Sequence, residues 1–297
     1  MQRQLTATQF PRTPDTSARR LAWLVRRPYG DVARDIAVTA ALMLTYFLLR
    51  GLRPDSIDDS VGRSLYIIKF EQTIGIFHEV RWQEIFLPNP HLMTVANIVY
   101  AWLHYPVLLA IALWLVVRDG AKFRFLRNVM MLSAIIGVVC YWLLPAAPPR
   151  LLELYGYDFG FVDTVHGATN DVKYFQPGPF VNDYAAIPSF HFGWIALASA
   201  ALWITTESRL VRAAAVAMSI LMWWAVTVTG NHFFFDMIMG GLVVGFAWVL
   251  VASIEQLDLR GFAQRMGLIP LDRPEPPWEY RDENGLFPAP PELSRES

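Results

Sequence analysis

Long apolar stretches separated by short polar segments make up most of this chain. Five of them, at about 92–117, 125–144, 188–206, 210–229 and 233–254, meet or approach the ~20 residues that a helix needs to cross a bilayer. A sixth stretch at about 32–50 is shorter, because its uninterrupted part, Ile36 to Leu49, lies between Asp35 and Arg50. The pattern predicts an all-α polytopic membrane protein with six transmembrane helices.

The segment 64–85 is apolar on one side and too charged to cross a membrane. We expect one or two helices in the plane of the interface, with aromatic side chains facing lipid or the helix bundle. These side chains are Tyr66, Phe70, Phe77 and Trp82. An ordinary surface helix packed on the bundle is the alternative.

Composition supports the membrane assignment. The chain is 54% hydrophobic and only 17% charged, whereas a soluble domain carries about a quarter charged residues. The net charge of −1 gives no basis for nucleic-acid binding. Cys140 lies inside an apolar stretch and is expected to be a packed small side chain. We divide the chain into an N-terminal arm (1–31), a six-helix membrane catalytic domain (32–255) and a Pro-rich tail (256–297).

Two histidines stand at the start of apolar stretches, each with polar companions. His232 and Asp236 are four residues apart, so on a helix they share one face and can form a hydrogen bond. A carboxylate in this position fixes the tautomer of the histidine and favours nucleophilic attack by its other ring nitrogen. His191, which follows Pro188-Ser189-Phe190, is a candidate proton donor.

Arg150 and Ser189 are candidates for holding a phosphate. Pro148 and Pro149 end an apolar stretch, which leaves Arg150 just outside the hydrocarbon, where a guanidinium can hold phosphate oxygens in a bidentate grip. Ser189 stands at a predicted helix start, and the free amides of such an end form an anion site. Together with His232, these residues predict phosphoryl transfer.

The remaining histidines lack such companions, and we expect them to be ordinary polar or interfacial residues. They are His78, His91, His104 and His166.

Basic residues in the short loops predict the orientation. They fall in the N-terminal arm, in the loop between the second and third spans, and in the loop between the fourth and fifth: Arg19, Arg20, Arg26, Arg27, Arg34; Arg118, Lys122, Arg124, Arg127; Arg209, Arg212. These segments lie on one side of a six-span protein. We therefore expect both termini in the cytoplasm of a bacterial inner membrane, with the site residues on the extracytoplasmic face.

Three blocks of the chain resemble the signature motifs of the type 2 phosphatidic acid phosphatase superfamily. They are Pro148-Pro149-Arg150, Pro188-Ser189-Phe190-His191, and Gly230-Asn231-His232 with Asp236. The branch of inositolphosphotransferases related to fungal inositol phosphorylceramide synthase is the most similar, and the spacing of Glu71, Gly75, Glu79 and Gln83 also fits it. The resemblance covers roughly residues 65–250.

This resemblance implies six helices and a metal-independent active site, without a cofactor, at the extracytoplasmic lipid surface. It implies that His232 is the nucleophile, forming a phosphohistidine, and that Asp236 orients it. His191 would protonate the leaving group, and Arg150 and Ser189 would hold the phosphate.

The chain departs from the larger phosphatase branch at two cations. That branch has a lysine where this chain has Leu143 and an arginine where it has Val226. Lys173 or Arg53 is a candidate replacement in the phosphate clamp. Phe190 stands where a glycine is usual, which fits the transferase branch better.

The acceptor decides the activity. Water would make the protein a lipid phosphatase, and a sugar or inositol hydroxyl would make it a transferase, so the choice depends on what the loop 151–187 binds. One alternative is a proton-coupled transporter that uses the histidines and Asp236 as a relay, and another is a catalytically silent lipid-binding relative. The polar residues gather at one interface and no internal repeat is visible, which favours the enzyme.

Overall fold

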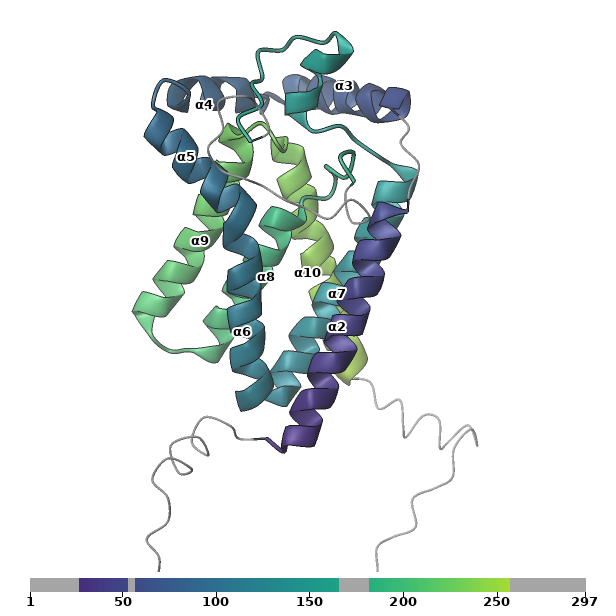
Figure 1. Cartoon of the computed structure of the whole chain (residues 1–297), viewed down its shortest axis with the longest axis vertical. Helices are drawn as coiled ribbons and strands as arrows, with labels where there is room; N and C mark the ends of the chain where they lie inside the picture. Colours follow the sequence, from purple (N-terminus) through teal and green to yellow (C-terminus); the bar gives the residue numbers. More distant parts are fainter. Residues whose placement is uncertain (1–26, 53–56, 166–181, 257–297) are drawn as a thin grey trace, which may run out of the picture. The chain divides into compact units, whose positions relative to one another are not determined.

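The structure is a computed structural model that describes residues 27–52, 57–165 and 182–256 (Figure 1). The packed helices belong to the compact unit that ends at Ala252. Within the described ranges there is no β-strand, and a single isolated bridge joins Ala146 to Ala185.

Among the residues that the structure describes, five helical spans are long and apolar enough to cross a membrane. They are α2 (Tyr29–Gly51), the continuous span Pro90–Arg118 made of α5 (Pro90–Ile98), η1 (Val99–Leu103) and α6 (His104–Arg118), α7 (Gly120–Leu143), α9 (Arg209–Val228) and α10 (Phe234–Gln256). A sixth apolar helix, α8 (Phe190–Thr205), has 16 residues. The predicted all-α polytopic membrane fold is confirmed.

The amphipathic segment forms two helices, α3 (Ile57–Ile74) and α4 (Glu79–Phe86), which lie across one end of the bundle (Figure 1). Gly75 separates them, with a φ of 78° that is easy only for glycine. Tyr66 is 75% exposed. Phe70 packs edge-on against Phe235, and Trp82 packs against Phe234. Phe70 and Trp82 are themselves partly exposed, so both side chains cover the start of α10 with one side and face outward with the other.

The span Pro90–Arg118 is interrupted by the π-helical turn η1. Pro106 lies three residues after this turn and has no N–H to donate to the carbonyl four residues earlier. A π-helical turn accommodates such a disruption without ending the helix. The turn places Tyr100 and His104 against the same neighbour, His191.

Two glycines allow α8 and α10 to approach closely. A Cβ on Gly193 would lie 2.8 Å from the carbonyl oxygen of Gly240, and a Cβ on Gly240 would collide with the backbone oxygen of Ser189. The amide of Ser189 also donates to the carbonyl oxygen of Asp236 at 3.0 Å. Backbone contact thus fixes the first turn of α8, which carries His191, against the first turn of α10.

The starts of α2 and α7 lie at the end of the bundle away from α3 and α4 (Figure 1). There Asp35, only 3% exposed, lies 2.7 Å from Arg27, 3.2 Å from Arg124 and 3.6 Å from Arg127. Pairing with several guanidinium groups is what allows a carboxylate to be buried in a membrane helix. Two of the basic segments used to predict orientation therefore meet at one end of the bundle.

Candidate active site

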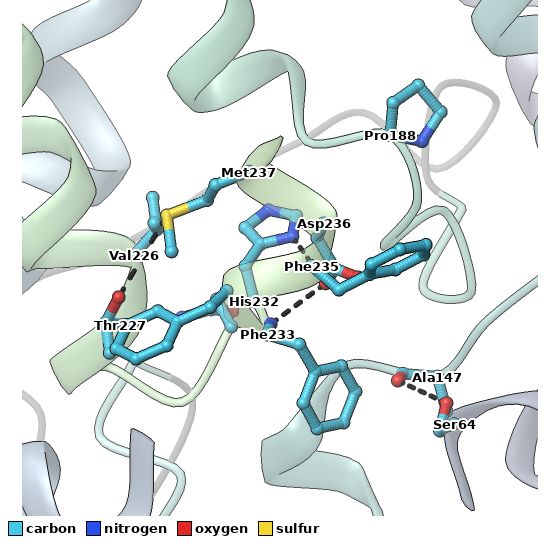
Figure 2. A network of polar contacts seen from close by, with 12 residues as sticks. Ser64, Ala147, Pro188, Val226, Thr227, His232, Phe233, Phe235, Asp236 and Met237 are labelled. Atoms are coloured by element: carbon cyan, nitrogen blue, oxygen red, sulfur yellow. Dashed lines mark hydrogen bonds and ion pairs between the residues drawn. The ribbon is translucent and has the colours of Figure 1, made fainter. Parts of the chain in front are cut away.

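His232 and Asp236 form the pair that their spacing predicts (Figure 2). Nδ1 of His232 lies 3.2 Å from Oδ2 of Asp236, and the amide of Phe233 donates to the same oxygen at 3.0 Å. His232 is 5% exposed and Asp236 is fully buried. With Nδ1 engaged by the carboxylate, Nε2 of His232 is the ring nitrogen that can attack an electrophile.

A tight turn after α9 presents His232. The amides of Asn231 and His232 both donate to the carbonyl oxygen of Val226, at 3.1 and 3.2 Å. Gly230 adopts a φ of 68°, and its carbonyl oxygen accepts the amide of Arg150 at 2.9 Å. The turn therefore joins the histidine block to the arginine block through the backbone.

His191 faces His232 across a small gap, with ring centroids 5.6 Å apart. Tyr100 stacks on the ring of His191 at 4.5 Å, and His104 meets it edge-on at 4.5 Å. Nε2 of His191 is buried and meets no hydrogen-bond partner within the described ranges. The role of His191 as a proton donor stays a prediction, and Nε2 is the nitrogen that would donate.

Arg150 is 9% exposed and is held on two sides. Its Nε donates to Oδ1 of Asn231 at 2.8 Å, and Nη1 lies 3.0 Å from Oδ2 of Asp163. Asp163 in turn accepts the amide of Val165. A bidentate grip on phosphate stays a prediction, and the second N–H of Nη1 together with the N–H groups of Nη2 are the donors that would make it.

Arg150, His191 and His232 line one cavity, which side chains of α2, α6, α7 and α8 also line. Its polar lining consists of Tyr46, Arg50, Tyr100, His104, Tyr105, Tyr141, Arg150, Asn182, Asp183, His191, Asn231 and His232. The cavity thus combines three histidines with two arginines, a set suited to holding an anion and moving a proton.

Arg50 is a cavity residue that the sequence analysis treated only as the charged end of an apolar stretch. Its Nη2 lies 3.4 Å from the carbonyl oxygen of Asn182, and the side chain of Asn182 donates to the carbonyl oxygen of Arg50 at 3.0 Å. These contacts tie the end of α2 to the segment that leads into α8. Arg50 therefore adds a cation from the first spanning helix.

The positions that lack the two expected cations lie outside the cavity lining. Leu143 ends α7 with 66% exposure, and Val226 is buried beneath the His232 turn. Lys173 and Arg53, named as candidate replacements, fall outside the described residues.

Ser189 occupies the N-cap position of α8, as predicted, but its hydroxyl does not accept an amide of that helix. The Oγ is fully buried and has no hydrogen-bond partner within the described ranges. Its backbone carries the local contacts, because the amide donates to Asp236 and the carbonyl accepts the amide of Gly193 at 3.0 Å. A role for Ser189 in holding phosphate stays a prediction.

His104 was expected to be an ordinary polar residue, and the structure places it beside His191. The sequence carried one usable signal, Pro106, which indicates an irregular helix at this point. Within the described ranges, no group of three or more His, Cys, Asp or Glu side chains is arranged to hold a metal ion. Metal independence stays a prediction.

A model of the PAP2 superfamily matches residues 65–250, so the chain belongs to that superfamily. The matched range contains Arg150, His191, His232 and Asp236. Membership supports a phosphatase-type function on lipid phosphates in a membrane setting. No curated protein and no solved structure gives a match.

Proposed function

We propose that this chain transfers a phosphoryl or phospho-alcohol group from a lipid phosphate through a covalent intermediate on His232. The observation that carries the proposal is the meeting, in one cavity, of His232 paired with Asp236, a second histidine 5.6 Å away and two arginines.

In the first step, Nε2 of His232 attacks phosphorus, the bond from phosphorus to the lipid oxygen breaks, and His191 gives that oxygen a proton. Asp236 accepts the Nδ1 hydrogen bond and stabilises the positive charge that develops on the ring. His191 then removes a proton from water or a hydroxyl acceptor as it attacks phosphorus, and the bond to His232 breaks. General acid–base catalysis of this kind typically contributes about 10²–10⁴-fold.

Arg150 and Arg50 would hold the phosphate from two sides. Arg150 is fixed by Asn231 and Asp163, so its guanidinium is preorganised, and preorganised donors stabilise developing charge well in a site that excludes water. Arg50 reaches the same cavity from α2. We propose that it replaces one of the two cations that the phosphatase branch has at the positions of Leu143 and Val226.

We further propose that the cavity opens to the extracytoplasmic side. The support is the cluster of Arg27, Arg124 and Arg127 around Asp35 at the far end of the bundle, because arginine-rich ends stay in the cytoplasm. A periplasm-active reporter fused after residue 256 should be inactive, and an active reporter would overturn this orientation.

The activity is tested with purified full-length protein on lipid phosphates, lipid diphosphates and phosphoinositides, with and without inositol or another alcohol acceptor. We expect turnover of at least one lipid phosphate, insensitive to chelator and lost in His232→Ala. Free phosphate as the product would make the protein a phosphatase, and transfer to inositol would place it in the inositolphosphotransferase branch. The absence of turnover on every substrate, or full turnover by His232→Ala, would overturn the proposal.

A further inference from the structure

Two buried glutamates on the helices α3 and α4 contact the start of α10. Glu71 on α3 and Glu79 on α4 are both 0% exposed. Oε1 of Glu79 accepts the amide of Phe234, and Oε1 of Glu71 accepts the amide of Phe235, each at 2.7 Å. The first amides of a helix have no carbonyl partner within it, so these two distant side chains supply acceptors for the amides at the N-terminal end of α10.

Three successive amides at this helix end are thus taken by three carboxyl groups. The amide of Phe233, immediately after His232, goes to Asp236, and the next two go to Glu79 and Glu71. A helix N-terminus often binds a ligand anion, but here protein carboxyl groups occupy these amides. They hold the backbone on which His232 is mounted, and phosphate binding falls to the arginines.

The turn at Gly75 brings the two glutamates together. In this turn between α3 and α4, the amide of Ile76 donates to the carbonyl oxygen of Glu71 at 2.9 Å. Their Oε1 atoms accept successive amides, so the two buried carboxyl groups lie next to each other. Neither Oε2 meets an N–H or hydroxyl donor within the described ranges. Two carboxyl groups can bond to each other only when one of them carries a proton.

Electrostatics favours the protonated form of Glu71. Burial, the hydrogen bond and negative charge of Glu79 on α4, and the charge of Asp236 on α10 raise the pKa of Glu71 to about 9. These two carboxyl groups are the acidic neighbours that act on Glu71 from the helices packed against it. Full ionisation would put three negative charges around one helical turn.

We propose that Glu71 and Glu79 are positioning residues that share one proton and lock the first turn of α10, so that His232 and Asp236 keep their mutual geometry. This inference rests on the proposed function, because it concerns the aim of the nucleophile. The shared proton stays on the two glutamates and is not transferred to substrate.

Glu71→Gln and Glu71→Leu separate the shared proton from simple packing. Glutamine keeps an oxygen for the amide of Phe235 and an N–H for Glu79, so it mimics the protonated acid, whereas leucine provides neither. We expect Glu71→Leu to lower kcat more than it changes KM, and Glu71→Gln to restore much of that loss. Glu84→Gln, on the exposed face of α4, is the matched control and should behave like the unaltered protein.

The pH dependence of stability gives a readout that needs no substrate. In the unfolded chain Glu71 ionises near 4.5, whereas in the folded protein it keeps its proton to about 9. The folded state therefore binds more protons between these values, and stability should fall as pH rises from about 4.5 to about 9. Thermal unfolding of the unaltered protein should show this fall in stability relative to Glu71→Gln. We also expect the unaltered protein to lose turnover as pH rises to about 9, and Glu71→Gln to keep its turnover there.

Failure of the glutamate inference and failure of the proposed function give different experimental results. Equal pH dependence of unfolding in the unaltered protein and Glu71→Gln would overturn the shared proton, even if the enzyme forms a phosphohistidine. Equal kcat in Glu71→Leu and the unaltered protein would overturn the positioning role. Loss of the proposed function instead appears as turnover that survives His232→Ala, whatever the glutamate variants do. If Glu71→Leu does not fold, Glu71→Gln and the unfolding curves still decide the question.

Discussion

Nδ1 of His232 and Oδ2 of Asp236 lie 3.2 Å apart, one helical turn from each other, in a site almost closed to solvent. The same carboxyl oxygen accepts the amide of Phe233, so Asp236 contacts both the ring of the histidine and the backbone that follows it. A nucleophile held at two points loses little freedom when the substrate arrives.

Asp236→Asn tests this orientation. The asparagine oxygen can still accept the amide of Phe233, but its N–H₂ group favours the wrong tautomer of His232. We expect the fold to persist and kcat to fall by about 10²-fold or more, measured by steady-state kinetics with thermal unfolding as the check on folding. A nearly unchanged kcat would contradict an orienting role.

His191→Ala tests the proton donor. The variant should lose about 10²–10⁴-fold on a lipid phosphate with a poor leaving group and far less on an aryl phosphate, whose leaving group needs no proton. The comparison is the ratio of kcat/KM for the two substrates. His78→Ala is the control, because His78 is exposed at the start of α4. Equal losses on both substrates would argue against acid catalysis by His191.

Arg50→Gln tests the second cation. We expect kcat/KM for a lipid phosphate to fall by about 10²-fold, with partial recovery in Arg50→Lys, which keeps the charge but not the planar fork. Arg81→Gln, exposed on α4, should leave kcat/KM unchanged. If Arg50→Gln keeps full activity, Arg150 alone holds the phosphate.

Gly240→Ala tests the close approach of α8 and α10. Its methyl group would collide with the backbone oxygen of Ser189, which the amide of Gly193 holds in a hydrogen bond. We expect a loss of about 1–3 kcal/mol in stability and a lower kcat, since His191 and His232 would be pushed apart. Gly245→Ala, on the same helix with nothing within 4 Å of the added Cβ, should be neutral in thermal unfolding. Equal stability of the two variants would show that the approach is not tight.

The spans were predictable because apolar length is a local property of the sequence. The His232–Asp236 pair was predictable for the same reason, since both residues lie within one helical turn. Arg50 was not, because its place in the cavity depends on how the end of α2 packs near the segment before α8. His104 was likewise hidden, since it reaches His191 only through a π-helical turn in a distant helix.

The two glutamates show a second reason why the sequence alone does not predict the whole site. Glu71 and Glu79 were noticed for their spacing, but their partners are backbone amides more than 150 residues away. No pattern within α3 and α4 predicts a hydrogen bond to the amide of Phe234 or Phe235. The buried hydroxyl of Ser189 shows the reverse case, in which a favourable capping residue occupies its position without making the side-chain bond.

Trapping of the covalent intermediate tests the central claim most directly. Purified protein is mixed with a lipid phosphate labelled on phosphorus, quenched within the first turnover, and analysed for protein-bound label. We predict a label that is lost in acid and stable in base, as expected for phosphohistidine, which accumulates in the unaltered protein and is absent from His232→Ala. Turnover without any such label, or equal labelling of His232→Ala, would contradict the account.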